Sequence, residues 1–139
     1  MNDEETWAFL ASSPARPAVL ATTRSNGRPH AAPVWYALDG HTIVFTTGRE
    51  TVKGRALLRD PRVAMCIDDD APPFSFVAVE GMAEISENPA ELLRWATILG
   101  GRYMGADQAE RFGVRNAVPG ELLVHVRPSR LTAFKDLAD

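Results

Sequence analysis

Cysteine is nearly absent from this sequence of 139 residues, and the single one, Cys66, excludes an internal disulfide bond. It also excludes a structural metal site of the common type that needs two to four thiolates. Cys66 lies in the apolar run of residues 63–67, so we expect a buried thiol that packs in the core rather than a reactive one.

Histidine is also scarce. The three histidines, at positions 30, 41 and 125, are too far apart to give the His-x-x-x-His or His-x-x-Glu-His spacing of a zinc site. No Gly-x-Ser-x-Gly sequence is present, which leaves serine hydrolase chemistry without support. The acidic run of residues 68–70 could hold a cation, but such a run more often ends a strand and keeps that end in water. We therefore expect no metal site.

Long apolar runs are missing as well, so no segment reaches the length of a membrane-spanning helix. Residues 1–5 are acidic and lack the basic start and apolar centre of a signal peptide, so we expect a cytoplasmic protein. The net charge of −3 argues against nucleic acid as a partner, since nucleic-acid-binding domains are usually basic. The length predicts a single domain over residues 1–139.

What the sequence does contain is a succession of short segments with the apolar or alternating pattern of β-strands. Between them lie short helical patterns with capping residues, one near Asn2 and another after Asn88-Pro89. This mixture predicts a mainly β fold of the α+β type, an antiparallel barrel of six strands with short flanking helices. The strands are expected over residues 18–23, 29–38, 42–47, 63–68, 74–85 and 122–126, with residues 131–134 continuing or doubling the last.

Glycine and proline mark where these strands turn or bend. Asn26-Gly27 and Asp39-Gly40 are typical of tight hairpin turns. Gly81 lies inside an apolar strand, where a glycine indicates a bulge or a close approach between backbones. Pro33 interrupts the second strand and removes one backbone donor, which indicates an edge strand.

The most informative segment joins the third strand to a short helix. Residues 46–55 pass from threonine hydroxyls and a glycine into a helix N-terminus that carries Arg49, Lys53 and Arg55. Bases are disfavoured at this end, because the helix dipole already gives it positive partial charge. Free helix N–H groups, hydroxyls and bases together form a site for a phosphate group. The alternative is a solvated basic helix that Thr51 caps.

No arrangement of nucleophile, acid and base emerges from the sequence, which is typical of a protein whose bound cofactor performs the chemistry. Residues 33–36, Pro-Val-Trp-Tyr, offer a place for a flat ring, because a proline leaves part of the strand edge open. The alternative is an edge-strand proline beside aromatic residues of the core.

Taken in order, these motifs resemble the pyridoxamine 5′-phosphate oxidase-like family of FMN-binding split β-barrel proteins. The similarity is greatest to the actinobacterial branch that uses the deazaflavin coenzyme F420, and it is close over residues 15–85. The order and spacing of the motifs are specific, whereas no single motif is decisive. The motifs are residues 20–22 (Leu-Ala-Thr), 26–30 (Asn-Gly-Arg-Pro-His), 33–36 (Pro-Val-Trp-Tyr), 39–40 (Asp-Gly), 45–48 (Phe-Thr-Thr-Gly), 53–55 (Lys-Gly-Arg), 59–63 (Arg-Asp-Pro-Arg-Val) and 79–81 (Val-Glu-Gly).

The resemblance implies a split barrel that forms a homodimer, with two cofactors at the interface between the subunits. It places the phosphate and its tail at the segment after the third strand, and the ring along the second strand. The partner subunit would contribute the start of the fifth strand. The cofactor-binding residues expected in this way are Pro33, Val34, Trp35, Thr46, Thr47, Gly48, Thr51, Lys53, Gly54, Arg55, Phe74 and Phe76.

The resemblance also implies an oxidoreductase that transfers a hydride between reduced F420 and a small conjugated organic substrate. F420 carries a lactate–glutamate tail on its phosphate, and Arg49, Arg55 and Arg59 would supply a basic groove for it. Water or Tyr36 would serve as proton donor. Two alternatives stay open, an FMN-binding oxidase or reductase and a cofactor-binding protein without turnover. Vitamin B6 oxidation is not expected, because residues 135–139 do not resemble the substrate-binding segment of the oxidases proper.

Overall fold

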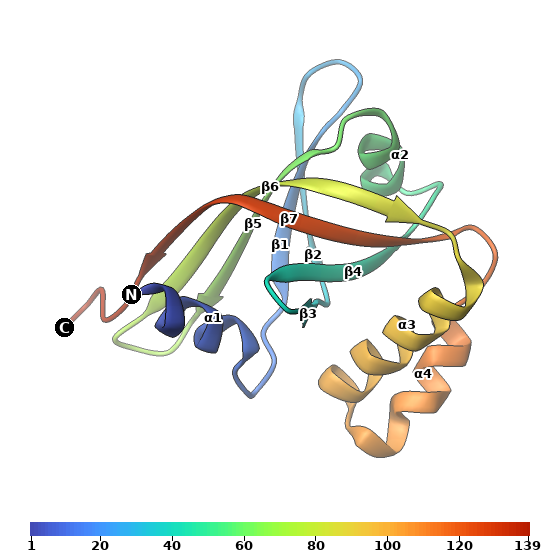
Figure 1. Ribbon diagram of the computed structural model, residues 1–139. Coiled ribbons are helices and arrows are strands. Elements are labelled where there is room, and N and C mark those ends of the chain that lie inside the picture. The colour runs from blue at the N-terminus through green and yellow to red at the C-terminus, as the bar shows by residue number, and fades with distance from the viewer.

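The computed structural model describes residues 1–139 as one seven-stranded antiparallel sheet flanked by helices (Figure 1). The strands are hydrogen-bonded in the order β2-β1-β5-β6-β7-β4-β3, so the fold is mainly β, as predicted. The elements are α1 (Asp3–Ala11), β1 (Ala18–Thr23), β2 (Pro29–Val34), β3 (Ala37–Asp39), β4 (Thr42–Gly48), α2 (Val52–Arg59), β5 (Arg62–Asp69), β6 (Ser75–Ser86), α3 (Pro89–Met104), the 3₁₀ helix η1 (Ala106–Gln108), α4 (Ala109–Asn116) and β7 (Glu121–Phe134).

The sheet has seven strands and not six, because the strand expected over residues 29–38 breaks into β2 and β3. At the break, Tyr36 leaves the strand ladder, and its N–H donates to the Tyr103 hydroxyl at 3.1 Å. That hydroxyl donates in turn to the Arg16 carbonyl oxygen at 2.8 Å, so helix α3 replaces a neighbouring strand as the partner of residue 36. Near the C-terminus, β7 runs through Pro128 and unites the two segments predicted there.

The strand order forces the sheet to curl. β2 and β3 form its two edges, yet only Trp35 and Tyr36 separate them in sequence. In a flat sheet, six strand spacings of about 4.8 Å would put these edges roughly 29 Å apart, whereas so short a link reaches only about 11 Å. The sheet therefore wraps into a barrel. No strand pairing joins β2 to β3 or β4, so a slit remains between these two edges of the sheet.

Gly81 marks the predicted irregularity in the longest hairpin, β6–β7. The pairing register shifts between Glu80 and Gly81, and a Cβ on Gly81 would lie 2.6 Å from the Arg127 carbonyl oxygen. Only a residue without a side chain allows the two backbones to approach this closely. The hairpin turns expected at Asn26-Gly27 and Asp39-Gly40 are also present, between β1 and β2 and between β3 and β4.

The core is divided between the barrel interior and a smaller layer outside it. Inside the barrel, Leu20, Phe45 and Met65 come from three different strands and are fully buried. Burial of each such side chain stabilises the fold by about 1.5–3 kcal/mol. Outside the barrel, Val44 of β4 packs in a second cluster with Trp95 of α3. This second layer fixes α3 against β4, and α4 packs in turn on α3 (Figure 1).

Part of the outer face of β1 and β5 is apolar and exposed. Strand β5 alternates exposed and buried residues over most of its length, so one side of its apolar run lies outside the barrel. Cys66 is exposed on that side, opposite Val19 of β1, which is itself 43% exposed. The expectation of a buried thiol was therefore wrong, because the run alternates between two faces instead of being enclosed on both.

None of the helices is both long enough and apolar enough to span a membrane. No three His, Cys, Asp or Glu side chains lie close enough together to hold a metal ion. Within the acidic run of residues 68–70, Asp69 pairs with Arg16 at 3.4 Å.

Candidate functional site

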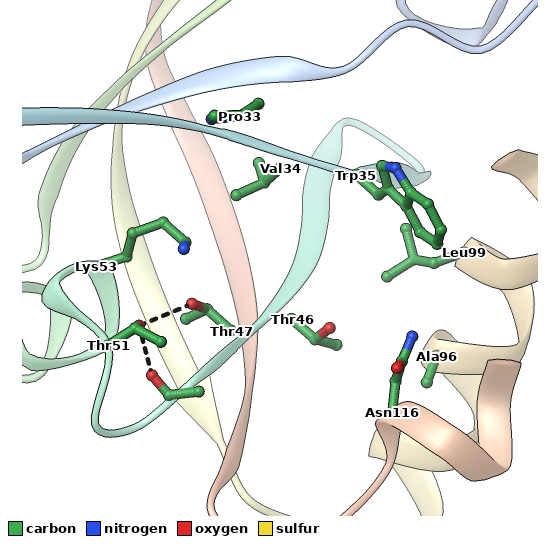
Figure 2. A pocket seen from close by; sticks show the side chains of 11 residues that line it. Pro33, Val34, Trp35, Thr46, Thr47, Thr51, Lys53, Ala96, Leu99 and Asn116 are labelled. Atoms are coloured by element: carbon green, nitrogen blue, oxygen red, sulfur yellow. Dashed lines mark hydrogen bonds between the residues drawn. The ribbon is translucent and has the colours of Figure 1, made fainter.

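The slit between the sheet edges contains a cleft of about 270 Å³ (Figure 2). Strand β4 pairs with β3 only from Thr42 to Val44, so residues 46–48 have a free edge on that side. The outer edge of β2 pairs with no strand. Helix α2 closes one end of the cleft, and α3 and α4 form the other end (Figure 2).

Thr51 organises the polar end of the cleft as the N-cap of helix α2. Its hydroxyl accepts the Gly54 N–H at 3.0 Å and donates to the Gly48 carbonyl oxygen at 2.7 Å. Thr47 Oγ1 lies 3.2 Å from Thr51 Oγ1, and since the single proton of Thr51 goes to Gly48, Thr47 donates in this pair. The Thr51 hydroxyl therefore has no proton for a ligand, whereas Thr47 can turn its proton toward one.

Helix α2 brings further anion-binding groups to this end. The first N–H groups of a helix have no acceptor within it, and Thr51 caps only that of Gly54, so those of Val52 and Lys53 remain free. No acidic residue occupies the first turn. The Lys53 side chain extends its amine toward the cleft (Figure 2). Together these groups attract an anion such as phosphate.

Gly54 supports the polar end without lining the cleft. A Cβ at this position would collide with the carbonyl group of Gly48 and lie 3.0 Å from the Arg49 carbonyl oxygen. The first turn of α2 can therefore rest on the turn that follows β4 only because residue 54 has no side chain.

Trp35 forms an aromatic wall at the other end of the cleft. Its ring stacks on that of Tyr103 from α3, with centroids 5.0 Å apart and planes 2° from parallel. It also meets the Phe112 ring of α4 edge-on, at 6.1 Å between centroids. Each such contact contributes about 0.5–1.5 kcal/mol beyond burial. Trp35 is thereby fixed, and the part that faces the cleft offers a flat surface.

Three residues at this end were not expected from the sequence: Ala96, Leu99 and Asn116. Ala96 and Leu99 lie on the apolar face of α3, and no sequence pattern separates a helix face that lines a cleft from one that fills a core. Asn116 is the last residue of α4, and Figure 2 shows its amide beside Ala96, directed toward the cleft. A single polar residue at a helix end carries no signal of its own.

Most of the residues expected from the sequence do meet around the cleft. Of the remaining four, Gly54 lies behind it, and Arg55 pairs with Glu50 at 2.8 Å elsewhere on α2. Phe74 and Phe76 lie at the start of β6 and do not line the cleft of their own chain. The eight that line it are Pro33, Val34, Trp35, Thr46, Thr47, Gly48, Thr51 and Lys53.

The arginines expected to bind a cofactor tail are all engaged within the protein, and none lines the cleft. Two of them form exposed ion pairs, which are weak, about 0–1 kcal/mol, so a ligand carboxylate can replace one. The three pairings are Arg49 with Glu87 at 2.7 Å, Arg55 with Glu50 at 2.8 Å, and Arg59 with the Thr23 carbonyl oxygen at 2.6 Å.

A separate basic groove lies on another face of α2. Arg55 and Arg59 border it together with Arg24 from the β1–β2 turn, and its volume is about 260 Å³. Val52 lines this groove, while Lys53, the next residue of α2, lines the cleft.

Tyr36 is unsuited to donate a proton in the cleft, contrary to one expectation. It is 1% exposed, and its hydroxyl donates to the Leu10 carbonyl oxygen at 2.7 Å. Burial raises the pKa of Tyr36 to about 12, despite the opposing effect of the Arg102 charge. Its hydroxyl is therefore a structural group that ties the link between β2 and β3 to α1.

One carboxylate lies behind the free edge of β4. Glu121 is the register partner of Gly48, and its Oε1 lies 3.5 Å from the position that a Cβ on Gly48 would take. Partial burial raises the pKa of Glu121 above its usual value, while the Lys53 charge and the Thr46 hydroxyl act to lower it. Glu121 thus adjoins two residues of the cleft without lining it.

The cleft offers binding groups rather than catalytic ones. Lys53 is its only titratable lining residue, so no base is present to activate the threonine hydroxyls as nucleophiles. An anion site at one end and a flat aromatic surface at the other suit a ligand that has both a phosphate and a planar ring.

Known proteins share this architecture. Residues 3–134 match the family model described as pyridoxamine 5′-phosphate oxidase. A conserved hypothetical protein of Mycobacterium tuberculosis has a structure 30% identical in sequence, with a TM-score of 0.85 over 100% of this chain and 89% of that one. An F420 reductase is 28% identical, with a TM-score of 0.71 over 90% of this chain and 94% of that one.

A putative pyridoxamine 5′-phosphate oxidase of Listeria innocua is 23% identical, with a TM-score of 0.71 over 94% of this chain and 96% of that one. At this identity the likeness concerns the fold alone. Among curated proteins, none matches the sequence.

Proposed function

Because this chain belongs to the pyridoxamine 5′-phosphate oxidase family, we propose that it is an F420-dependent oxidoreductase of the cytoplasm. Its substrate would be a small conjugated organic molecule. The observation that carries the proposal is one cleft with an anion site, formed by Lys53 and the start of α2, and an aromatic wall, formed by Trp35. The 28% identity to an F420 reductase supports the choice of cofactor.

The residues of the cleft fit a phosphorylated cofactor with a planar ring. The free N–H groups of Val52 and Lys53 and the movable proton of Thr47 match the oxygens of a phosphate. The cleft volume of about 270 Å³ is slightly below the roughly 300–1,000 Å³ of typical ligand pockets, so one chain encloses only part of such a ligand. This favours a second subunit that completes the site.

Each part of the cleft would then have a defined task. Lys53 and the first turn of α2 bind the phosphate, while Trp35 and Leu99 hold the ring and keep water away from one side of it. A bound reduced deazaflavin supplies a hydride from its ring. The proton that accompanies the hydride comes from water, since Tyr36 is buried and Lys53 is reserved for the phosphate.

We assign the glutamate tail to the basic groove on α2. A tail that leaves the phosphate at Lys53 meets Val52 and then the guanidinium groups of Arg55, Arg59 and Arg24. The groove therefore contains Arg55 and Arg59, two of the three arginines that the sequence predicted to bind the tail, and also Arg24. Arg49 is the exception, because its pair with Glu87 lies away from this groove.

We further propose a homodimer in which the exposed face of β1, β5 and β6 meets its symmetry mate. One row of residues across this face is apolar and ends at Pro33, which also lines the cleft. The interface would thus continue into the cleft and bring the partner subunit's Phe74 and Phe76 near it. In register, the row is Pro33, Val19, Cys66 and Ala78.

Cys66 gives a direct test of the dimer, because it is the only thiol and lies in the middle of the proposed interface. We expect light scattering to report about twice the 15.2 kDa chain mass, and maleimide to label Cys66 more slowly as protein concentration rises. A measured mass equal to that of one chain, together with a Cys66 thiol that reacts at the same rate at all protein concentrations, would refute the dimer.

FMN is the second candidate cofactor, and one observation favours it. The arginines expected at the tail are paired within the protein, whereas the phosphate site is free, and FMN ends at its phosphate. A cofactor-binding protein without turnover is the third candidate, favoured by the lack of acid–base groups in the cleft.

Titration of the purified protein with F420 and with FMN tests the proposal. We expect colourless protein from a host that lacks F420, binding of F420 about tenfold tighter than FMN at low salt, and oxidation of bound reduced F420 by conjugated enones or quinones. Stoichiometric FMN in the purified protein would favour the flavin candidate. Binding of F420 without turnover of any acceptor would favour the carrier. Failure of both cofactors to bind would refute the proposal.

A further inference from the structure

We propose that Glu121 makes the cleft select a singly charged phosphodiester over a doubly charged phosphomonoester. This inference rests on the proposed function and names the ligand feature that the polar end distinguishes. F420 joins its phosphate to the lactate of its tail, which leaves a diester with one negative charge. FMN ends in a monoester, which carries about −1.5 to −2 charges at pH 7.

The position of Glu121 places its charge directly behind the phosphate site. It is paired in register with Gly48, and its Oε1 lies 3.5 Å from the place of an absent Gly48 side chain. The Thr46 hydroxyl, on the same face of β4 as Gly48, favours the charged form of this carboxylate and so lowers the pKa of Glu121. Because a glycine separates it from the cleft, no side chain at position 48 screens the carboxylate from a bound phosphate.

The charges around the polar end leave little to balance a second negative charge. Lys53 is the only charged residue that lines the cleft, and Glu121 opposes it. Arg49 adds nothing, because Glu87 neutralises it at 2.7 Å. The charges of Lys53 and Glu121 therefore sum to zero, and the helix dipole adds only about half a positive charge. One negative charge on a ligand is matched, but a second meets the Glu121 carboxylate without a cation.

The same reasoning predicts how the selection depends on pH. The charged groups that face Glu121 are Lys53 of α2 and, across a neighbouring pocket, Glu87 with its partner Arg49. Burial raises the pKa of Glu121, so its charge is lost at a higher pH than that of an exposed glutamate. A phosphate monoester also takes up its second proton near pH 6. At pH 5 the monoester carries a single negative charge, as the diester does, so the selection should be present at pH 7.5 and nearly absent at pH 5; protonation of Glu121 acts in the same direction.

Glu121→Gln tests the proposal through binding alone, measured by calorimetry with F420 and FMN. Repulsion by one fixed charge doubles when the ligand charge doubles, so the fold-change for FMN should be the square of that for F420. We expect affinity to rise about tenfold for FMN and about threefold for F420 at pH 7.5. Glu84→Gln, the same change in net charge beside Arg127 and away from the cleft, should alter neither affinity.

The competing outcomes are distinct. Equal fold-changes for the two cofactors, or none, would overturn the role of Glu121 while leaving the proposed function intact. Failure of the unmodified protein to bind either cofactor would overturn both the role of Glu121 and the proposed function. Glu121→Asp keeps the charge and should keep the selection, which guards against a Gln variant that fails to fold.

A second readout does not depend on any variant. Binding and protonation are reciprocally linked, so FMN should raise the pKa of Glu121 more than F420 does, as followed by NMR of the labelled carboxyl group. A Glu121 pKa that responds equally to both ligands would contradict the proposal.

Discussion

The two ends of the cleft are built in different ways. The polar end comes from one continuous segment, residues 46–54, and the hydrogen bonds that hold its threonine hydroxyls and cap helix α2 join residues three or four positions apart. The aromatic end is assembled from Trp35, Leu99 and Asn116, which are far apart in sequence and meet only because α3 and α4 pack beside β4. A short segment thus determines the anion site, whereas the ring site depends on the whole fold.

The largest effect is expected from Gly54→Ala, which changes the tightest backbone contact at the polar end of the cleft. The new Cβ would collide with the Gly48 carbonyl group, and α2 would have to move away from β4. Overpacking of this kind costs about 1–3 kcal/mol of unfolding free energy, and displacement of α2 should abolish phosphate binding. Chemical denaturation and cofactor titration measure the two effects.

Gly48→Ala is the matched control for stability, because its Cβ would meet only the Thr51 methyl group at 3.3 Å and a Glu121 oxygen at 3.5 Å. A Gly54→Ala protein as stable as Gly48→Ala would show that the close contact between α2 and β4 is dispensable.

Lys53→Ala should separate binding from folding at the same end. The side chain reaches into the cleft and faces only the Glu121 charge without a direct ion pair, so we expect only a small decrease in melting temperature. Loss of one charge-assisted hydrogen bond should weaken F420 binding by about 1.5–3 kcal/mol. Isothermal titration gives the dissociation constant. An unchanged constant in a folded variant would remove Lys53 from the site.

Trp35→Leu should affect binding and folding together at the assembled end. The substitution removes the stack with Tyr103 and the edge contact with Phe112, each worth about 0.5–1.5 kcal/mol of stability. We expect a lower melting temperature and F420 binding weaker by about 1–2 kcal/mol through loss of the flat surface. Trp35→Phe should retain most of both properties. A Leu variant that loses neither would mean that the aromatic wall is not part of the ring site.

The smallest effect is expected from salt, which acts on the groove beyond the polar end. The guanidinium groups of Arg24, Arg55 and Arg59 are solvent-accessible, so each contact with a tail carboxylate adds only a few tenths of a kcal/mol. The preference for F420 over FMN should shrink as salt rises. Arg24→Gln should reduce the preference at low salt, whereas Arg127→Gln, which pairs with Glu84 and does not line this groove, should not. A preference independent of salt would place the tail elsewhere.

The same contrast explains how much could be predicted from the sequence. The Thr51 cap, the hairpin turns and the bulge at Gly81 depend on neighbouring residues or on one residue type, and all were predicted. The break at Tyr36 was missed because it depends on a hydroxyl 67 positions away. The local segment likewise indicated most of the polar end, whereas Asn116 became a candidate only once α4 was in place.

The partners of charged side chains were a second feature that the sequence could not predict. Arg49, Arg55 and Arg59 looked like one basic groove, but the acceptors that engage them include Glu87 and the Thr23 carbonyl group, which lie more than thirty positions away in sequence. A sequence displays charges but not the directions in which their side chains point. The exposure of Cys66 was missed for a related reason, since an apolar run does not reveal which of its faces the fold leaves open.

The prolines of β2 have a consequence for self-association. An unpaired strand edge is a place where another extended chain can add itself and begin aggregation. Proline occurs in such strands where its nitrogen points away from the neighbouring strand, so positions 29, 31 and 33 of β2 direct their nitrogens outward. Pro29 and Pro33 carry no N–H, which leaves Ala31 as the one outward donor. The opening that admits a ligand is therefore a poor template for polymerisation.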